Sequence, residues 1–260
     1  MTMKNNIWIL TLSVLLTRGA VGQAQSANAT DSQTTLTAIT PSQTIKVSLT
    51  PNQDSVFGFT AKAGEYASIV LTHSSYNFGN CTQCIAPTVT ILDPKGQSLA
   101  ARQLSAAALS SQGQFVNAVR LPLSGQYRVN FASQNNPAGN VDATLFLFDN
   151  EFGAVTSNAP ATVDIKYPGQ KALLFFQGTA GQQVSFTLQN ATFAPCHSCN
   201  SLTARIMPLA GPAIVWARIS DNETSASTTS GTLPASGRYT LVIDPQGFRT
   251  GSVDVTLSLN

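Results

Sequence analysis

The sequence predicts an all-β protein in which two tandem jelly-roll-like antiparallel β-sandwiches follow a signal peptide. Three observations lead to this prediction. Short runs of residues alternate between apolar and polar, which is typical of strands with one buried face. Turn residues separate these runs at the spacing of about 8–12 residues found in sandwiches. Sequence landmarks also return in the same order roughly 115 residues later, which indicates a domain-sized repeat.

The repeat is carried by four landmarks. They are the segments 63–71, 81–84, 121–131 and 139–145, which return as 180–188, 196–199, 233–243 and 251–257. The third landmark reads Leu-Pro-x-Ser-Gly-x-Tyr in both copies and predicts a turn that leads into a strand, because proline fixes φ and glycine accepts a positive φ. Since the order is kept and the spacing changes little, we interpret the chain as a tandem duplication with small loop deletions.

The first 39 residues are predicted to lie outside the sandwiches. Residues 1–24 have the pattern of a secretory signal, because the apolar stretch Ile7–Leu16 follows a basic start and is too short to span a bilayer. An uncleaved N-terminal anchor is the alternative. Residues 25–39 are rich in Ser, Thr, Gln and Ala and are predicted to be a flexible leader. As the alternative, Thr35–Thr40 adds as a strand to a sheet edge.

Residues 40–150 are predicted to form the first sandwich, residues 151–160 a linker, and residues 161–260 the second sandwich. In the first sandwich, strands are expected at 45–49, 56–59, 66–71, 88–92, 114–121, 127–131 and 143–148. In the second, strands are expected at 163–167, 173–176, 184–188, 203–207, 214–219, 239–243 and 253–259. Each run alternates or is rich in β-branched and aromatic residues, which suits a half-buried strand.

Two further residues, one in a turn and one in a strand, are interpreted from their local sequence. Asp93-Pro-Lys-Gly96 has the composition of a β-turn, so Asp93 is interpreted as a turn residue. Trp216 lies in the apolar run Ile214–Ala217 and is therefore expected in the core of the second sandwich.

The composition restricts the classes of partner. Charged residues make up 10% of the chain, against about 25% in ordinary globular proteins. The net charge is +2 and no basic patch with interleaved aromatic residues occurs, so neither nucleic acid nor an anionic membrane is an expected partner. With the signal peptide, this composition predicts an exported protein, extracellular or periplasmic, that has no membrane span of its own.

The order of turns and strands resembles a known family. The Ala-Gly turn, the Asp-Pro-x-Gly turn, the Leu-Pro-x-Ser-Gly-x-Tyr strand start and the Gly-x-Val-Asp-x-Thr-Leu strand are similar to those of the bacterial pre-peptidase C-terminal domain. That domain is a small jelly-roll sandwich appended to secreted hydrolases. The resemblance spans both repeats and implies an extracellular, non-catalytic module that binds polymers or aids secretion. The chain departs from the family in lacking a dense acidic loop for calcium and in adding a Cys-x-x-Cys to each repeat.

The four cysteines form two Cys-x-x-Cys pairs at matching places in the repeats. Because exported proteins keep disulfides, we expect one bridge within each pair, Cys81–Cys84 and Cys196–Cys199, out of three connectivities. A four-cysteine zinc site and a redox-active pair are the alternatives. The two pairs lie much further apart than the ligands of a zinc module, and neither pair opens a helical pattern. We therefore expect no metal.

Aromatic residues near the cysteines are the candidates for ligand contact, together with one histidine: Tyr76, Phe78, Phe193 and His197. Aromatic side chains in the loops of a sandwich can stack on sugars. The alternative is that the two phenylalanines belong to the core, since Phe is usually buried. Asp142 and Asp254 occupy equivalent positions and are interpreted as strand-edge carboxylates, because a calcium ion requires six or more oxygen ligands.

No catalytic or cofactor motif occurs in the chain. The sequence therefore predicts a secreted, non-enzymatic protein without a cofactor, which binds a polymer such as a polysaccharide, a cell surface or a surface protein. The alternative is a structural subunit of an extracellular assembly that self-associates by strand exchange or by stacking of its domains. An enzyme of unrecognised type is the third hypothesis.

Overall fold

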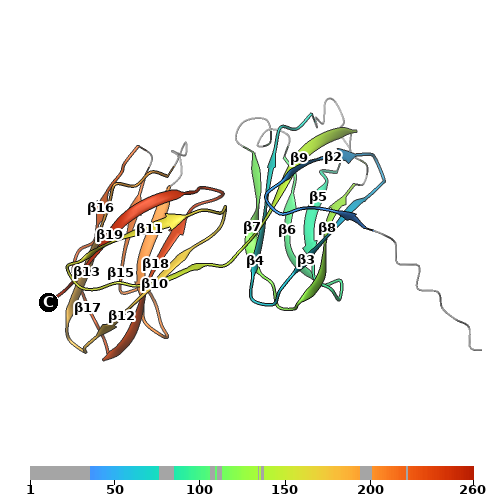
Figure 1. The fold of residues 1–260 in the computed structure, drawn as a ribbon. Coiled ribbons are helices and arrows are strands. Elements are labelled where there is room, and N and C mark those ends of the chain that lie inside the picture. The colour runs from blue at the N-terminus through green and yellow to red at the C-terminus, as the bar shows by residue number, and fades with distance from the viewer. Residues whose placement is uncertain are drawn as a thin grey trace, which may run out of the picture. The chain divides into compact units, whose positions relative to one another are not determined.

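The computed structural model describes residues 36–75, 85–105, 109, 113–133, 135, 138–193, 201–220 and 222–260. The elements with assigned bounds in these residues are all β-strands, and they form two sandwiches one after the other along the chain (Figure 1). The predicted fold class, all-β with two tandem jelly-roll-like sandwiches, is confirmed. None of the described residues form a helix that is long and apolar enough to cross a membrane.

The first sandwich consists of a five-stranded and a four-stranded sheet. The five-stranded sheet has the order β1 (Thr37–Ala38), β3 (Ser55–Ala61), β8 (Gly125–Ala132), β5 (Thr88–Leu92) and β6 (Ser98–Gln103). The four-stranded sheet has the order β2 (Thr44–Leu49), β9 (Gly139–Phe148), β4 (Tyr66–Thr72) and β7 (Gln114–Arg120).

The second sandwich repeats this plan. Its first sheet has the order β10 (Glu151–Ala154), β12 (Ala172–Gly178), β18 (Gly237–Pro245), β14 (Leu202–Met207) and β15 (Val215–Ile219). Its second sheet has the order β11 (Pro160–Ile165), β19 (Gly251–Leu259), β13 (Gln183–Gln189) and β16 (Ala226–Ser227), and β17 (Gly231–Thr232) also pairs with β13.

The strand pairs are nested in the manner of a jelly roll. In the first sandwich β2 pairs with β9, β3 with β8, β4 with β7 and β5 with β6. In the second, β11 pairs with β19, β12 with β18, β13 with β16 and β17, and β14 with β15. All of these pairs are antiparallel, and successive pairs alternate between the two sheets. This nesting produces the double-sheet architecture in which the two inner faces form the core.

Each sandwich has its own hydrophobic core. Buried residues from Ile39 to Leu145 form one cluster, and buried residues from Val155 to Leu257 form another. The strands supply these residues at every second position, as the alternation in the sequence predicts. Each sandwich therefore buries its own set of apolar residues.

The structure corrects both boundaries that flank the first repeat. We expected residues 25–39 to be a leader and 151–160 a linker, yet β1 pairs in parallel with β3, and β10 pairs in parallel with β12. Ile39 and Val155, which follow these two strands, are buried in the cores. Burial of these side chains explains why the strands dock on the sheet edges, as in the strand-addition alternative. The similar triplets Ala38-Ile-Thr40 and Ala154-Val-Thr156, which differ only in a β-branched residue, were the overlooked signal.

The Leu-Pro-x-Ser-Gly-x-Tyr motif joins two turns in each sandwich. The Tyr127 hydroxyl donates to the Leu123 carbonyl (2.6 Å) and accepts from the Leu123 N–H (3.1 Å). The Ser124 hydroxyl accepts from the Ala63 N–H of the neighbouring Ala-Gly turn (2.9 Å). Tyr239 and Ser236 make the corresponding bonds in the second sandwich. The motif is therefore explained by local structure.

Replacing Tyr239 by phenylalanine is expected to destabilise the second sandwich by about 1–2 kcal/mol, because the carbonyl and the N–H of Ala235 both lose their partner. Equilibrium urea unfolding of the variant and the wild type measures this difference. An unchanged unfolding midpoint would show that water replaces the hydroxyl without cost.

Candidate functional site

The structure separates the residues that the sequence suggested for a site. Seven of them lie outside the described residues: Tyr76, Phe78, His197, Cys81, Cys84, Cys196 and Cys199. Phe193 is only 8% exposed and belongs to the second core, which agrees with the core interpretation of this residue and removes it as a candidate for ligand contact. Trp216, in contrast, is more exposed than the sequence predicted. We expected it in the core, but it is 60% exposed, because Val215 and Ala217 take the inward positions of β15.

Two of the carboxylates singled out in the sequence, Asp93 and Asp254, accept hydrogen bonds from neighbouring groups. Asp93 accepts from two backbone N–H groups of its own turn, both at 2.8 Å, which agrees with its interpretation as a turn residue. Asp254 accepts from the Thr162 hydroxyl (2.6 Å) and from the Asn190 side-chain amide (2.7 Å). Among the described residues, no group of three or more His, Cys, Asp and Glu side chains is placed to hold a metal ion.

The hydrogen bonds from Thr162 and then Asn190 hold the pKa of Asp254 below its ordinary value of 3.8. A carboxyl group whose pKa is lowered by folding stabilises the protein above its unfolded pKa, and this contribution is lost as the pH falls through the folded pKa. The stability difference between wild type and Asp254→Asn is therefore expected to be larger at pH 7 than at pH 3, as measured by urea unfolding. A difference that grows on acidification would contradict this prediction.

Large exposed apolar side chains are concentrated on the second sandwich. Phe152, Leu209 and Trp216 are three of the four such side chains in the described residues, and Phe152 is 62% exposed. Strand register places five outward-facing residues in one row across the five-stranded sheet, namely Phe152, Leu173, Val242, Arg205 and Trp216. At about 4.8 Å per strand, this row spans roughly 19 Å. An aromatic ring therefore stands at each end of a largely apolar row.

A second row lies beside the first and contains Ala154, Phe175, Thr240 and Met207. These two rows, together with Lys171, Thr203, Arg218, Arg238 and Asp244, are called the outer face below. The intervening residues of the same strands are buried in the core, because side chains alternate along a strand. The outer face is thus the surface of the sheet that is turned away from the sandwich interior.

Ring contacts and ion pairs hold the outer face in place. The rings of Phe152 and Phe175 stack with their centroids 6.4 Å apart and their planes 11° apart. The Arg238 guanidinium lies 5.0 Å from the centroid of Phe175, which is a cation–π contact. Asp244 accepts from the Lys171 ammonium (2.8 Å), and its carboxylate lies 3.6 Å from the Arg205 guanidinium. Arg205 therefore stands within the first row, next to Trp216, and the other charged groups border the two rows.

The first sandwich provides an internal comparison, because its strands pair in the same register. Inside the sandwiches, Phe59 stacks on Tyr127 as Phe176 stacks on Tyr239. The outward positions differ between the copies. Phe175, Arg205, Trp216 and Val242 correspond to Gly58, Thr90, Ala101 and Asn130 in the first sandwich. The stacked ring pair of the core is present in both sandwiches, whereas Phe175, Trp216 and Val242 have no large apolar counterpart at the matched outward positions of the first sandwich.

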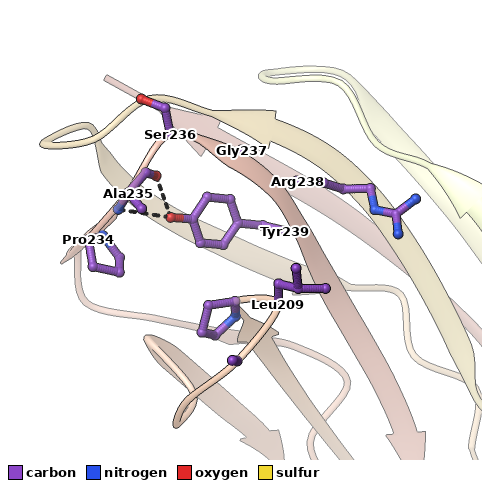
Figure 2. A pocket seen from close by; sticks show the side chains of 9 residues that line it. Leu209, Pro234, Ala235, Ser236, Gly237, Arg238 and Tyr239 are labelled. Carbon is purple, nitrogen blue, oxygen red and sulfur yellow. Dashed lines mark hydrogen bonds between the residues drawn. The ribbon is translucent and has the colours of Figure 1, made fainter. Parts of the chain in front are cut away.

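A pocket of about 380 Å³ adjoins the outer face (Figure 2). The turn after β14 contributes Pro208 and Leu209, and the turn before β18 contributes Pro234. Figure 2 shows the ring of Tyr239 between the turn at Pro234 and the side chain of Leu209. Arg238 lines the pocket and also belongs to the outer face, so the two are continuous.

Sequence reasoning missed the outer face and the pocket. The search for a site concentrated on the cysteine loops, whereas the site residues are spread over five strands that are distant in sequence. A signal was present in the alignment of the repeats. At the position of Gly58 the second copy has Phe175, and at the position of Ala101 it has Trp216. An aromatic side chain in place of a small one at an outward position does not contribute to packing of the core.

No family model matches the chain, and no curated protein matches it. Solved structures show distant likeness. PliG of Aeromonas hydrophila, a periplasmic inhibitor of g-type lysozyme, has 16% identity over 43% of this chain and 99% of its own, with a TM-score of 0.29. The CUB1-EGF-CUB2 domain of human MASP-1/3 has 11% identity over 83% of this chain and 99% of its own, with a TM-score of 0.28. The PBSX exported protein XepA has 11% identity over 82% and 85%, with a TM-score of 0.30. Likenesses at this level carry no argument about function.

Proposed function

We propose that this chain is an exported, non-catalytic binding protein and that the outer face of its second sandwich is the recognition surface. The observation that supports this proposal is the row from Phe152 to Trp216, in which two aromatic side chains are exposed on one face of a sheet. The partner is a macromolecule, because a row of roughly 19 Å is wider than a small ligand covers.

The fold itself does not require aromatic residues at these positions. The first sandwich has the same topology with Leu36 and Ala101 in the places of Phe152 and Trp216. An exposed aromatic side chain forgoes about 1.5–3 kcal/mol that complete burial of a large apolar side chain provides. Binding energy at protein interfaces is concentrated in a few residues, among which Trp, Tyr and Arg are enriched. Coverage of the outer face by a partner accounts for both rings.

The polar groups of the outer face suit recognition better than chemistry. Its carboxylate, Asp244, is paired with Lys171 and lies close to Arg205, so it is held as a fixed counter-charge. The described residues of the outer face include no serine, cysteine or histidine that a base would activate as a nucleophile. These features support the absence of catalysis at this surface.

The experiment compares two double variants of the mature protein. Phe152→Ser with Trp216→Ser removes both rings from the outer face, and Leu36→Ser with Ala101→Ser changes the matched positions of the first sandwich. Each biotinylated protein is titrated on the envelope fraction of its source cells and on a glycan array. We expect saturable binding by the wild type and the control, and at least tenfold weaker binding by the outer-face variant.

Equal urea-unfolding midpoints of the outer-face variant and the wild type establish that the variant is folded. If the folded outer-face variant binds as tightly as the wild type, the outer face is not the recognition surface.

A further inference from the structure

We propose that the partner of the outer face is a protein whose contact surface places acidic residues around an apolar side chain, and that this side chain enters the pocket beside Arg238. The inference rests on the proposed function and adds the class of partner and the point at which it is anchored. It is carried by two separate observations, which are the charge of the outer face and the opening of the pocket.

The outer face has an excess of positive charge that the fold does not require. Among its described residues there are four cations, Lys171, Arg205, Arg218 and Arg238, and one carboxylate, Asp244. Arg238 lies over an aromatic ring, and Asp244 is already shared between Lys171 and Arg205. The first sandwich has other residues at the positions of the four cations, namely Asp54, Thr90, Gln103 and Gln126. Acidic residues on a partner would complement this charge.

The composition of the outer face favours a protein over a glycan or a second copy of the chain. Aromatic residues, Met and Arg are enriched in protein interfaces, and the outer face contains all three types. Sugar hydroxyl groups need hydrogen-bond partners, whereas Leu173 and Val242 occupy the centre of the row. A second copy docked face to face would place arginine residues opposite arginine residues, and such like-charge contacts are unfavourable.

The pocket is open because the second repeat lacks one proline of the first. In the first sandwich a Cβ added to Gly125 would lie 3.2 Å from Cγ of Pro94, so the proline ring closes this space. The corresponding residues of the second sandwich are Leu209 and Gly237, and nothing lies within 4 Å of a Cβ added to Gly237. Leu209 is 91% exposed beside the open space. An incoming apolar group would therefore cover both the pocket wall and this leucine.

The chemistry of the pocket specifies what enters it. The Tyr239 hydroxyl donates to the Ala235 carbonyl and accepts from the Ala235 N–H, so both of its hydrogen-bonding roles are used within the turn. Arg238 is the one charged residue among those that line the pocket, and its guanidinium lies beside the pocket, over the ring of Phe175. An apolar side chain such as Leu, Phe or Trp, with a neighbouring Asp or Glu within reach of Arg238, matches this combination. Arginine binds carboxylates through paired hydrogen bonds, which adds geometric selectivity.

The probe is a phage-displayed library of random linear peptides selected on the mature wild-type protein. We expect the enriched peptides to combine Leu, Phe or Trp with a neighbouring Asp or Glu. Their affinity is measured by the fluorescence anisotropy of dye-labelled peptides, because one of the variants compared lacks Trp216 of the outer face. Affinity is expected to fall with increasing salt, because the charges at the rim are screened.

Two variants introduce residues of the first sandwich into the second. Leu209→Pro restores the proline that fills the pocket, and Arg238→Gln removes the cation. Each is expected to weaken peptide binding about tenfold, and Arg238→Gln is also expected to remove the preference for acidic peptides. The matched control, Pro94→Leu in the first sandwich, should leave the affinity unchanged. Equal urea-unfolding midpoints establish that all three variants are folded.

The outcomes separate this inference from the function on which it rests. If Phe152→Ser with Trp216→Ser abolishes binding but Leu209→Pro and Arg238→Gln do not, the outer face is the recognition surface and the pocket assignment is overturned. If the enriched peptides lack acidic residues, the proposal of an acidic protein partner is overturned. Saturable binding to a glycan array, with no enriched peptide, overturns it as well. The inference is also overturned if no selected peptide binds more weakly to Arg238→Gln than to the wild type.

Discussion

Replacing Phe186 by alanine is expected to destabilise the second sandwich by about 3–5 kcal/mol. Phe186 lies on β13 and is 1% exposed, and it is one of the largest fully buried side chains in the described residues. Its strand pairs with β19 on one side and with β16 and β17 on the other, so the backbone has little freedom to close the cavity that the ring leaves. Urea unfolding followed by Trp216 fluorescence reports on this sandwich directly.

The first sandwich supplies the control for this prediction. Ile69 occupies the matched position on β4 and is fully buried in the other core cluster. Ile69→Ala is expected to destabilise the first sandwich by about 2–5 kcal/mol, which far-UV circular dichroism detects, and to leave the Trp216 transition in place. If Ile69→Ala moves the Trp216 transition as far as Phe186→Ala does, the two sandwiches unfold as one cooperative unit.

The second large effect is expected at Gly178, where the core has no room for a methyl group. A Cβ added to Gly178 would overlap Cδ1 of Leu233 and would lie 3.3 Å from the ring of Tyr239. Both of these side chains are buried and held by the turn before β18. Gly178→Ala is therefore expected to destabilise the second sandwich by about 1–3 kcal/mol, through displacement of packed side chains. The Trp216 transition in urea measures the change.

Ala61, on β3, is the matched residue of the first sandwich, and there the methyl group is accommodated as a buried part of the core. Ala61→Gly serves as the control, with an expected cost of about 0.5–1 kcal/mol that arises from the backbone entropy of glycine. Unchanged stability of Gly178→Ala would mean that Leu233 moves aside at little cost.

The matching topology of the two sandwiches allows structural requirements to be separated from function. Where both copies need a feature to fold, the residues agree, as in the tyrosine motifs at Tyr127 and Tyr239 and the ring stacks beneath them. The outward positions of the first sheet agree much less, although the strands that carry them pair in the same register. Phe175 and Trp216 are therefore not required by the fold that the two sandwiches have in common.

The sequence by itself determined the fold class and the turns, because these depend on local patterns. A strand with one buried face alternates at every second residue, and a turn needs its proline, its serine and its glycine within a few positions of one another. The motif at Leu121–Tyr127 could be recognised for this reason before its hydrogen bonds were known. Even the edge strand at Thr37–Ala38 had a local signature, because the triplet Ala38-Ile-Thr40 is similar to Ala154-Val-Thr156 at the end of β10.

Only the tertiary structure decided which way Trp216 faces and which residues surround it. The run Ile214–Ala217 is apolar at every position, so its pattern does not distinguish the buried side of the strand from the exposed side. The outer face was hidden for a related reason. Phe152 and Trp216 are separated by more than sixty positions in the chain, and they share a row only because four strand pairings fix their register. Register between distant strands is set by how two whole sheets bury their inner faces, and no local pattern in the sequence contains it.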